Sequence, residues 1–408
     1  NRNLFWWPAF AGISRSGDFG FTTGAVSFDE AHTPRGHYFT VWRRQPDGAW
    51  KWIYDGGVGP IVDAGVLNAV DADVPMAALW TYPRGAGPRP ATSADIRGAA
   101  SAAHLYGRTL VAAESMTSGM QPWAYAPADL RRFTDAEFGA GVDQMVIHSS
   151  VHQPLDDRKP GLSLLMFGQF FNRHETWAEM AKPWMDYISR CSHLLQQGRF
   201  HADIAYFYGE DATAVGQTTF GNLPDVPRRY AYDLVNERAL RELLTVDGRA
   251  LVARSGARYQ ALFLGGGSRI MTLPTLRRIA ELTEAGATVI GLPPLASPSL
   301  PDDAAAFAAL VKQLWGPGVD NVVGAGRGIA SVDVEDGLSR AGIAPDFEAV
   351  GAGDAADLAF VHRTTDGSDI YFVSNSATRS RDLSARFRVT GTRPQIWRAV
   401  SATIRAPA

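Results

Sequence analysis

Hydrophobic and polar positions alternate with a period of two over residues 1–57, and this alternation predicts β-strands. Two aromatic strands, His37–Trp42 and Trp50–Tyr54, flank the turn Gln45–Gly48, in which proline fixes φ and glycine supplies a positive φ. A hairpin of this kind needs further strands or a helix to cover its apolar face. We therefore expect residues 1–57 to be the end of an antiparallel β domain.

The pattern changes after two breaker-rich stretches at residues 55–60 and 83–90, where short apolar runs begin to alternate with amphipathic ones. The apolar runs predict strands, and the amphipathic runs predict helices. The second of these predicted strands ends at His148. Strands that alternate with helices indicate a parallel sheet or barrel. The predicted strands are 109–113 and 144–148, and the predicted helices are 93–106, 127–139 and 176–197.

A second α/β layout follows, and the chain then ends in strands only. Its alternating elements predict a doubly wound domain, and an Asp366-Gly367 hairpin turn marks the all-β tail. The predicted strands are 203–208, 261–264 and 288–291, the predicted helices are 232–244, 273–285 and 302–314, and the tail strands are 358–363, 369–374 and 384–389.

Composition narrows the class of protein. The chain of 408 residues is 46% hydrophobic and 20% charged, so it can bury several cores. A net charge of −3 excludes a broadly basic nucleic-acid binder, and the single Cys191 excludes a disulfide scaffold or a cysteine-based zinc module. No apolar run approaches about 20 residues, so we expect no transmembrane helix. The chain starts at Asn1 without methionine, and we expect it to begin inside a longer sequence.

Glu114 is the most informative single residue, because it follows the apolar run 109–113 and precedes several hydroxyl residues. In α/β barrels the active site lies at the carboxyl ends of the strands. A carboxylate there can act as a general base on water or as a nucleophile. The alternative is a glutamate that only caps or bridges a neighbouring loop.

A polar mouth is predicted beside it, where the next strand ends at His148 and His152. These two histidines can bind sugar hydroxyls, whereas a pair without a third ligand is weak support for a metal site. Arg173 is expected to reach into the same mouth. Trp123 and Trp177 are candidates for stacking on a sugar, with packing in the core as the alternative for each.

Three other features have structural readings. Glu175 is expected at the start of the helix 176–197, as a helix-terminal residue. The glycine-rich segment Gly265–Ser268 lacks the lysine and the spacing of a phosphate loop, so a tight turn is expected. Glu210 ends its own strand and can reach a domain interface.

Residues 70–408 resemble the C-terminal portion of the glycoside hydrolase family 106 α-L-rhamnosidases. The resemblance rests on four segments in order, which are ADIRGAASAAHLYGRTLVAAESMTS, GVDQMVIHSSVHQP, PGLSLLMFGQFFNRHETWAEMAKPWMDYISRCSHLLQQGRFHADIAYFYGE and ALFLGGGSRIMTLPTLRRIAELTEAGATV. It implies a (β/α) barrel, a flavodoxin-like or glutamine-amidotransferase-like domain and β-sandwich modules. It also implies inverting hydrolysis of terminal α-L-rhamnose with calcium at the active site, a secreted or periplasmic parent, and Glu114 as the general base.

Residues 1–57 resemble the last strands of the SnoaL-like, ketosteroid-isomerase-like cone fold of the DUF4440 type. The segments SGDFGFTTG and GHYFTVWRRQPDGAWKWIYDGG carry this second resemblance. It implies a small-molecule pocket lined by Trp6, Trp42, Trp50 and Trp52.

Together these readings give a multidomain α/β chain. The expected order is a cone-fold fragment at 1–57, a junction at 58–69, a partial barrel at 70–200, a flavodoxin-like domain at 201–355 and a β-sandwich start at 356–408. An inverting glycosidase needs two carboxyl groups, and the family's acid lies on an earlier barrel strand that this chain lacks. The alternatives are an inactive truncated or fused product, a small-molecule-binding module and, least favoured, a nucleotide-binding module at the Gly265 turn.

Overall fold

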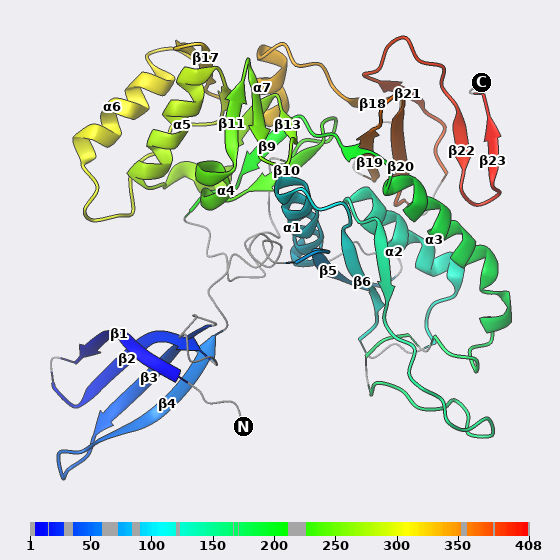
Figure 1. Ribbon diagram of the computed structural model, residues 1–408, viewed down its shortest axis with the longest axis horizontal. Helices are drawn as coiled ribbons and strands as arrows, with labels where there is room; N and C mark the ends of the chain where they lie inside the picture. The colour runs from blue at the N-terminus through cyan, green and yellow to red at the C-terminus, as the bar shows by residue number, and fades with distance from the viewer. Residues whose placement is uncertain are drawn as a thin grey trace. The chain divides into compact units, whose positions relative to one another are not determined.

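The structure is a computed structural model, and it describes residues 5–14, 16–27, 36–58, 72–83, 90–119, 123–165, 167–169, 171–210, 226–351, 357–377 and 380–406. The chain divides into two compact units, Asn1–Ala64 and Gly65–Ala408. Each is described by itself below (Figure 1).

The first unit contains an antiparallel sheet in the order β1-β2-β3-β4. The expected hairpin is confirmed: the turn after β3 closes with hydrogen bonds from Gln45 N to Ala49 O and from Gly48 N to Gln45 O, and Gly48 has φ +84°. The side chains of Trp6 and Trp52 lie outside the described residues, so the cone pocket stays a prediction. The strands are β1 (Phe5–Ile13), β2 (Phe19–Ser27), β3 (Gly36–Arg44) and β4 (Trp50–Val58).

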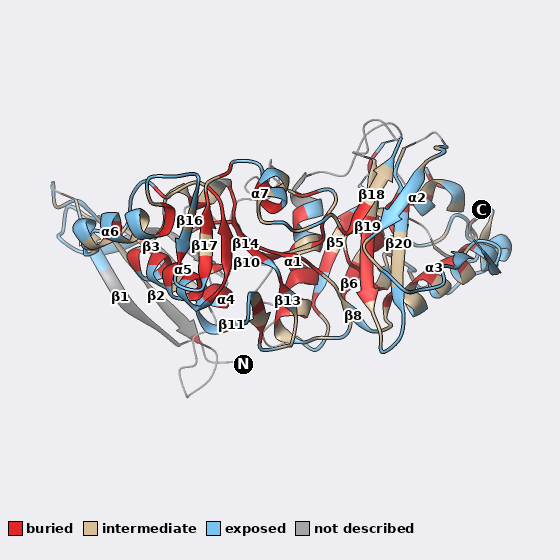
Figure 2. Ribbon diagram, turned by 90° about the horizontal axis from the view of Figure 1, so that it is seen from above, coloured by how far each residue is buried: buried red, intermediate tan, exposed pale blue. Residues whose placement is uncertain are grey.

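The second unit begins, within the described residues, with a parallel sheet in the order β5-β6-β7. A helix follows each of its strands. One face of β6 carries Ala113 and Ser115, both fully buried against the helices. The opposite face carries Glu114, which is half-buried. Figure 2 colours the strands and helices of this part by burial. The elements are β5 (Met76–Trp80), α1 (Pro90–Tyr106), β6 (Ala112–Thr117), α2 (Pro127–Gly139), β7 (Gln144–Ile147), the 3₁₀ turn η1 (Ala178–Met180) and α3 (Lys182–Leu195).

Two expected elements shift in this region. The strand predicted at 109–113 begins only at Ala112 and runs to Thr117, so Glu114 lies inside the strand and not after it. The helix predicted at 176–197 begins only at Lys182, because Pro183 fits the first turn, where its missing N–H costs no hydrogen bond. The β5 strand was not predicted.

The following α/β part is built on a sheet in the order β10-β9-β14-β15-β17-β16, parallel except for the antiparallel β16. Its central strand β9 is fully buried, as a parallel strand covered on both faces should be. The sheet strands are β9 (Ile204–Phe207), β10 (Tyr232–Val235), β14 (Ala261–Leu264), β15 (Thr288–Ile290), β16 (Asp320–Val323) and β17 (Gly326–Ile329). The other elements are α4 (Glu237–Glu242), β11 (Leu244–Asp247), β12 (Ala250–Ala253), β13 (Arg258–Tyr259), η3 (Gly266–Arg269), α5 (Leu273–Ala285), α6 (Ala304–Trp315) and α7 (Val334–Arg340).

The helix predicted at 232–244 is wrong in its first part. Residues 232–235 form strand β10, which pairs with β9, and Asn236 then caps the short helix α4 by accepting a hydrogen bond from Ala239 N at 2.8 Å. The buried neighbour β9 decides the strand, because pairing and burial override local helix propensity.

The C-terminal part is all-β, as expected. The hairpin β19-β20 pairs with the short β8 and packs on α2, where Phe138 and Phe372 meet edge to face with ring centroids 5.7 Å apart. The strands are β8 (Arg199–Phe200), β18 (Phe347–Val350), β19 (Leu358–Thr364), β20 (Asp369–Asn375), β21 (Ser384–Phe387), β22 (Ile396–Arg398) and β23 (Thr403–Arg405). Among the described residues, no helix is long and apolar enough to span a membrane.

Candidate active site

Strand β6 fixes Glu114 between its two neighbours in the parallel sheet. In register, Glu114 lies beside Ala78 of β5 on one side and Val146 of β7 on the other. Val146 is 41% exposed, so the face of the sheet that carries Glu114 is open to solvent at this level. The carboxylate therefore stands on an accessible sheet face, away from the helix-covered core.

A bulge near the end of β6 turns a hydroxyl toward this carboxylate. The pairing of β5 with β6 shifts register between Leu79 and Trp80, and Met116 opposite the shift has φ +70°. In a regular strand, residues three apart point to opposite faces. Here Thr117 Oγ1 nevertheless donates a hydrogen bond to Glu114 Oε1 at 2.7 Å. The strained backbone at Met116 is thus linked to the placement of a polar pair, which is common at functional sites.

The loop after β7 folds back over the end of β6. Gly168 N donates to Ser118 O at 2.9 Å, and Phe167 forms an isolated antiparallel bridge with Gly119. The Phe167 ring also meets Trp80 at the end of β5, with centroids 5.7 Å apart. The ends of all three parallel strands therefore meet under one loop.

His148 lies at this meeting point, and its backbone N donates to Ser115 O at 2.9 Å. Its Nδ1 is buried and has no hydrogen-bond partner among the described residues. A Cβ built on Gly168 would come within 3.2 Å of that nitrogen, and Gly168 has φ +87°. The glycine therefore permits the close approach of the loop, which covers this ring nitrogen.

His152 and Arg173 line a polar pocket of about 430 Å³ beyond the strand end, together with Ser150, Val151, Gln153 and Asn172. His152 is exposed. The side chain of Gln153 is occupied, because its Oε1 accepts from Leu162 N at 2.8 Å and its Nε2 donates to Leu162 O at 2.7 Å. Gln153 therefore holds the loop together.

Arg173 also shapes this loop. Its Nη2 donates to Gln153 O at 2.9 Å and to Leu155 O at 3.3 Å, and it pairs with the exposed Asp156 at 2.6 Å. The guanidinium thus lines the pocket and at the same time ties the loop to the segment before η1.

The two candidate tryptophans differ. Trp177 packs with Phe171 and Trp184, each with ring centroids 5.9 Å from its own, so its side chain belongs to an aromatic core cluster. Trp123 is 38% exposed and has φ +64°. Of the two, Trp123 is better placed to offer a ring face to a ligand.

Two other carboxylates have local roles. Glu175 accepts a hydrogen bond from Thr176 N at 2.8 Å, in a turn ahead of η1 and not within α3, where it was expected. Glu210 accepts from Thr272 N at 2.7 Å and from Thr272 Oγ1 at 2.9 Å, at the start of α5. Neither is placed as the partner of Glu114. The Gly265–Ser268 segment is a tight turn, closed by Ser268 N donating to Gly265 O.

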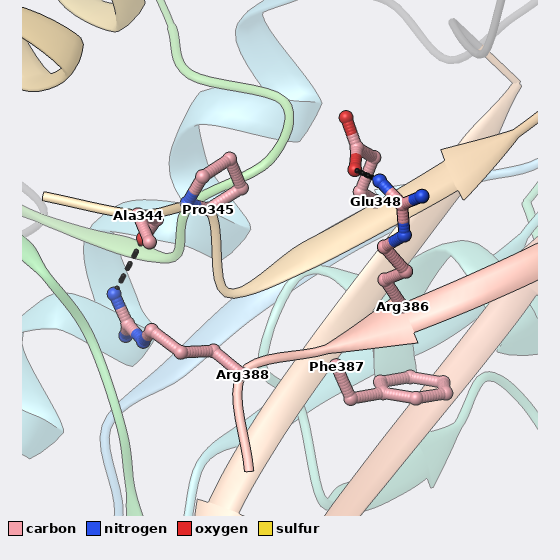
Figure 3. Close-up of a pocket in the computed structure, with 6 residues that line it drawn as sticks. All are labelled: Ala344, Pro345, Glu348, Arg386, Phe387 and Arg388. Carbon is pink, nitrogen blue, oxygen red and sulfur yellow. Dashed lines mark hydrogen bonds and ion pairs between the residues drawn. The ribbon is translucent and has the colours of Figure 1, made fainter.

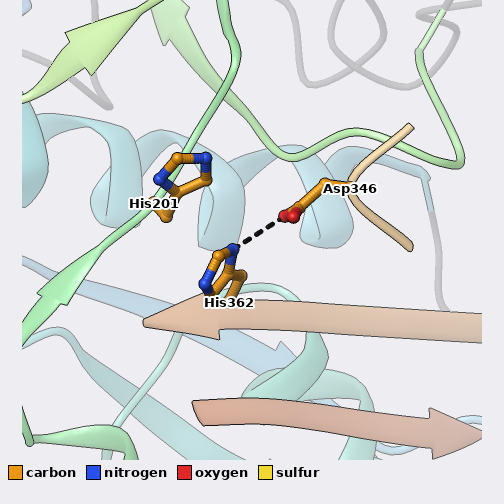
Figure 4. Close-up of side chains that lie close together, drawn as sticks. All are labelled: His201, Asp346 and His362. Carbon is orange, nitrogen blue, oxygen red and sulfur yellow. Dashed lines mark hydrogen bonds and ion pairs between the residues drawn. The ribbon is translucent and has the colours of Figure 1, made fainter. Parts of the chain in front are cut away.

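A His/Asp cluster that no sequence pattern indicates lies outside this mouth. His201, Asp346 and His362 bring their polar atoms within 4.8 Å of one another (Figure 4). His362 Nδ1 lies 2.9 Å from Asp346 Oδ2 and its Nε2 lies 3.0 Å from Asp369 Oδ1. The ring of His362 therefore bridges two carboxyl groups through its two nitrogens.

The cluster already contains a cation. Arg388 Nη2 lies 2.6 Å from Asp203 Oδ1 and 3.1 Å from His201 Nε2. Arg388 and the His362 ring thus provide partners for the buried carboxyl groups without a metal ion. A cluster with two histidines also does not suit calcium, which prefers six to eight oxygen ligands. No other group of three such side chains occurs among the described residues, so the expected calcium stays a prediction.

A second hollow, of about 250 Å³, is lined by residues 344, 345 and 348 around the start of β18 and by residues 386–388 at the end of β21 (Figure 3). Arg386 there pairs with Glu348 at 3.1 Å, and Arg388 donates to Ala344 O at 2.7 Å. These charged groups are already paired, and the hollow has no role in the site around Glu114.

Known proteins resemble most of this chain. The sequence model of glycoside hydrolase family 106, described as alpha-L-rhamnosidase, matches residues 48–406. A solved structure of a rhamnosidase from Novosphingobium sp. PP1Y is similar with a TM-score of 0.79 and 51% sequence identity, over 83% of this chain and 32% of that one.

A curated relative from Formosa agariphila, named "Putative beta-glucuronidase", is 37% identical over 313 residues, which are 76% of this chain and 25% of the relative. The chain therefore spans a quarter to a third of the length of these two proteins.

Proposed function

This chain belongs to the α-L-rhamnosidase family of glycoside hydrolases, and we propose from this premise that it contributes one side of an active site that removes terminal α-L-rhamnose from glycans or glycosides. The observation that carries the proposal is the accessible Glu114 carboxylate, held by Thr117 at the strand ends. A carboxylate in this setting suits a general base that activates water.

The proposed mechanism is hydrolysis with inversion of configuration at the sugar, which requires a second carboxyl group as the acid. Inverting glycosidases place an acid and a base about 6.5–9.5 Å apart, so that a water molecule fits between the base and the sugar. Glu175 and Glu210 are engaged elsewhere. We therefore propose that the acid comes from a strand outside β5, β6 and β7. Of the two catalytic carboxyl groups, these three strands supply only the base, Glu114.

We also propose which fold each of the two α/β parts adopts. Three parallel strands with intervening helices are what the last part of a (β/α) barrel would contribute. The order β10-β9-β14-β15-β17 is 2-1-3-4-5 in chain order, which is the flavodoxin-like order. We propose a partial barrel followed by a flavodoxin-like domain. The SnoaL-like origin of residues 1–57, calcium binding and secretion or periplasmic location remain predictions from resemblance.

Sugar binding is assigned to the polar side chains around the mouth. We propose that the partly exposed His148 binds a rhamnose hydroxyl, and that His152 and Arg173 bind the next sugar in the pocket of about 430 Å³. Trp123 supplies a ring face, whereas Trp177 serves packing.

Hydrolysis of an aryl α-L-rhamnoside with and without calcium tests the activity, and Glu114→Gln tests the base. An aryl β-glucuronide run in parallel separates the rhamnosidase reading from the activity named for the Formosa agariphila relative. Rhamnoside turnover that Glu114→Gln leaves unchanged removes Glu114 from the mechanism.

Binding of L-rhamnose, followed by NMR titration, covers the case in which the chain lacks turnover. Binding that is lost in His148→Ala supports a substrate site without its acid. The absence of both turnover and binding would favour the alternative of an inactive product.

A further inference from the structure

A fully buried carboxyl group lies behind the strand that carries Glu114. Glu137 on α2 has 0% exposure, and its Oε2 lies 2.9 Å from Ser115 Oγ on the helix-facing side of β6. Its Oε1 is buried without a hydrogen-bond partner among the described residues. Among the described residues, none forms an ion pair with Glu137. The core around it contains Leu130, Phe133 and other apolar side chains.

The hydrogen bonds around Ser115 bear on the protonation state of Glu137. Ser115 Oγ lies within bonding distance of Ala113 O, at 3.1 Å, as well as of Glu137 Oε2. A hydroxyl has one proton to donate, and a backbone carbonyl can only accept. An ionised Glu137 would also only accept, so two acceptors would compete for one proton.

A neutral Glu137 satisfies all three groups. Its own O–H donates to Ser115 Oγ, and Ser115 O–H donates to Ala113 O. The partnerless Oε1 is then a neutral carbonyl oxygen, which is far cheaper to bury than half of a carboxylate. Burial acts in the same direction, because it raises the pKa of Glu137 well above its usual value, while the Ser115 hydrogen bond offsets part of the rise.

We propose that Glu137 is a positioning residue, present as a neutral carboxylic acid, whose hydrogen-bond chain through Ser115 to Ala113 fixes the backbone on both sides of Glu114. This inference rests on the proposed role of Glu114. Glu114 sits between the two residues that the chain of hydrogen bonds joins, and its side chain projects from the opposite face of β6. The neutral state also keeps a second negative charge away from the proposed base.

The protonation state is tested on the unmodified protein. Infrared spectra of protein with isotope-labelled glutamate should show a carboxylic-acid C=O band at pH 7 to 8, and Glu137→Gln should remove that band. The absence of the band in the wild-type protein at this pH overturns the proposal. This measurement needs neither enzymatic activity nor a destabilised variant.

The positioning role is tested by the carboxyl ¹³C NMR signal of Glu114, assigned with Glu114→Gln. Glu137→Gln keeps a donor for Ser115, so the Glu114 signal should stay in place. Glu137→Leu and the milder Ser115→Ala break the chain of hydrogen bonds, so the signal should move and any rhamnoside turnover should fall about tenfold to a hundredfold.

An unmoved Glu114 signal in folded Ser115→Ala would show that the network serves packing only and would overturn the positioning role. If Glu114→Gln leaves hydrolysis unchanged while the infrared band is present, the proposed function fails and the neutral Glu137 stands. The two failures are therefore distinguishable.

Discussion

Thr117 Oγ1 donates a hydrogen bond to Glu114 Oε1 at 2.7 Å, although the two residues are three positions apart in one strand. The left-handed backbone at Met116 makes this possible, since it cancels the alternation that would otherwise separate their side chains. The proposed base is therefore oriented from within its own strand.

Removal of this donor should weaken the site without disturbing the fold. Thr117→Val keeps the shape of the side chain, and we expect any rhamnoside turnover to fall about tenfold or more, since a hydrogen bond to a charged group contributes about 1.5–3 kcal/mol. Thr117→Ser, which retains the hydroxyl, is the matched control and should remain near the wild-type rate. Equal kcat values for Thr117→Val and wild type would contradict the role of Thr117.

Arg173 is expected to act through the geometry of its loop as well as its charge. Arg173→Lys keeps the charge but cannot hold the carbonyls of Gln153 and Leu155 as the guanidinium does. We expect faster hydrogen exchange across residues 151–156 and weaker binding of a rhamnosyl disaccharide in both Arg173→Lys and Arg173→Gln. Wild-type exchange and affinity in Arg173→Lys would mean that only the charge matters.

The two tryptophans should separate stability from binding. Trp177→Ala removes a member of an aromatic cluster and should cost about 3 kcal/mol of unfolding free energy, measured by urea denaturation. Trp123→Ala should cost under about 1 kcal/mol, because the ring is partly exposed, but should weaken rhamnose binding. A stable Trp177→Ala that loses binding would reverse this assignment.

Asp143 should make the folded state less stable as the pH rises. Burial raises the pKa of this carboxyl from 3.8 to about 6, against the opposing hydrogen bond from Val111 N and the charges of Arg363 and His104. Between these two values the folded state binds the extra proton, so the unfolding free energy falls by about 3 kcal/mol from pH 4 to pH 6 and then levels off. Asp143→Asn should lack this fall, and a variant that retains the whole wild-type slope would contradict the assignment.

Asp346 should have the opposite dependence. Burial tends to raise its pKa, but the hydrogen bond and charge of His362 outweigh this, so the pKa is lowered. Its contribution is complete above its ordinary pKa of 3.8 and is lost as the pH falls through the lowered value. Asp346→Asn should cost about 3 kcal/mol at pH 7, because it removes a buried carboxylate that partners His362, Tyr371 and Arg388.

The matched control for Asp346 is Asp369→Asn. This carboxylate pairs with the other nitrogen of His362 but is partly exposed, so its loss should cost about 1 kcal/mol. The comparison is made by chemical denaturation at pH 7 and again near pH 3. Equal losses in the two variants at pH 7 would contradict the burial argument.

Helices with strong end signals could be predicted from the sequence to the residue. The predicted ranges 127–139 and 273–285 agree with α2 and α5, each of which has a proline in its first turn. In contrast, β10 was read as helix, because its apolar run is short and only the neighbouring β9 decides its conformation. Local sequence signals therefore predict where helices begin and end, but they do not predict which segments pair as strands.

The candidate site was predictable in its members but not in its geometry. His148 directly follows β7, as the alternation of strands and helices predicts, whereas Glu114 was expected after its strand and lies inside β6. The Met116 bulge carries no local signal, since methionine seldom adopts a positive φ. Glu137 was missed because glutamate is rarely buried, and the His201 cluster because its residues are far apart in the chain.

Helix α1 belongs to two sheets at once. It packs on β5 and on β10, where Ser101 Oγ accepts from Leu234 N at 2.8 Å and His104 pairs with the buried Asp233. The segment 70–200 and the segment that follows therefore share one hydrophobic and polar seam. They should unfold in a single cooperative transition. If the chain were divided near residue 200, each of the two fragments would expose the surface that the other one buries in the intact protein. The proposed border between barrel and flavodoxin-like domain thus separates two sheets that are expected to fold as one unit.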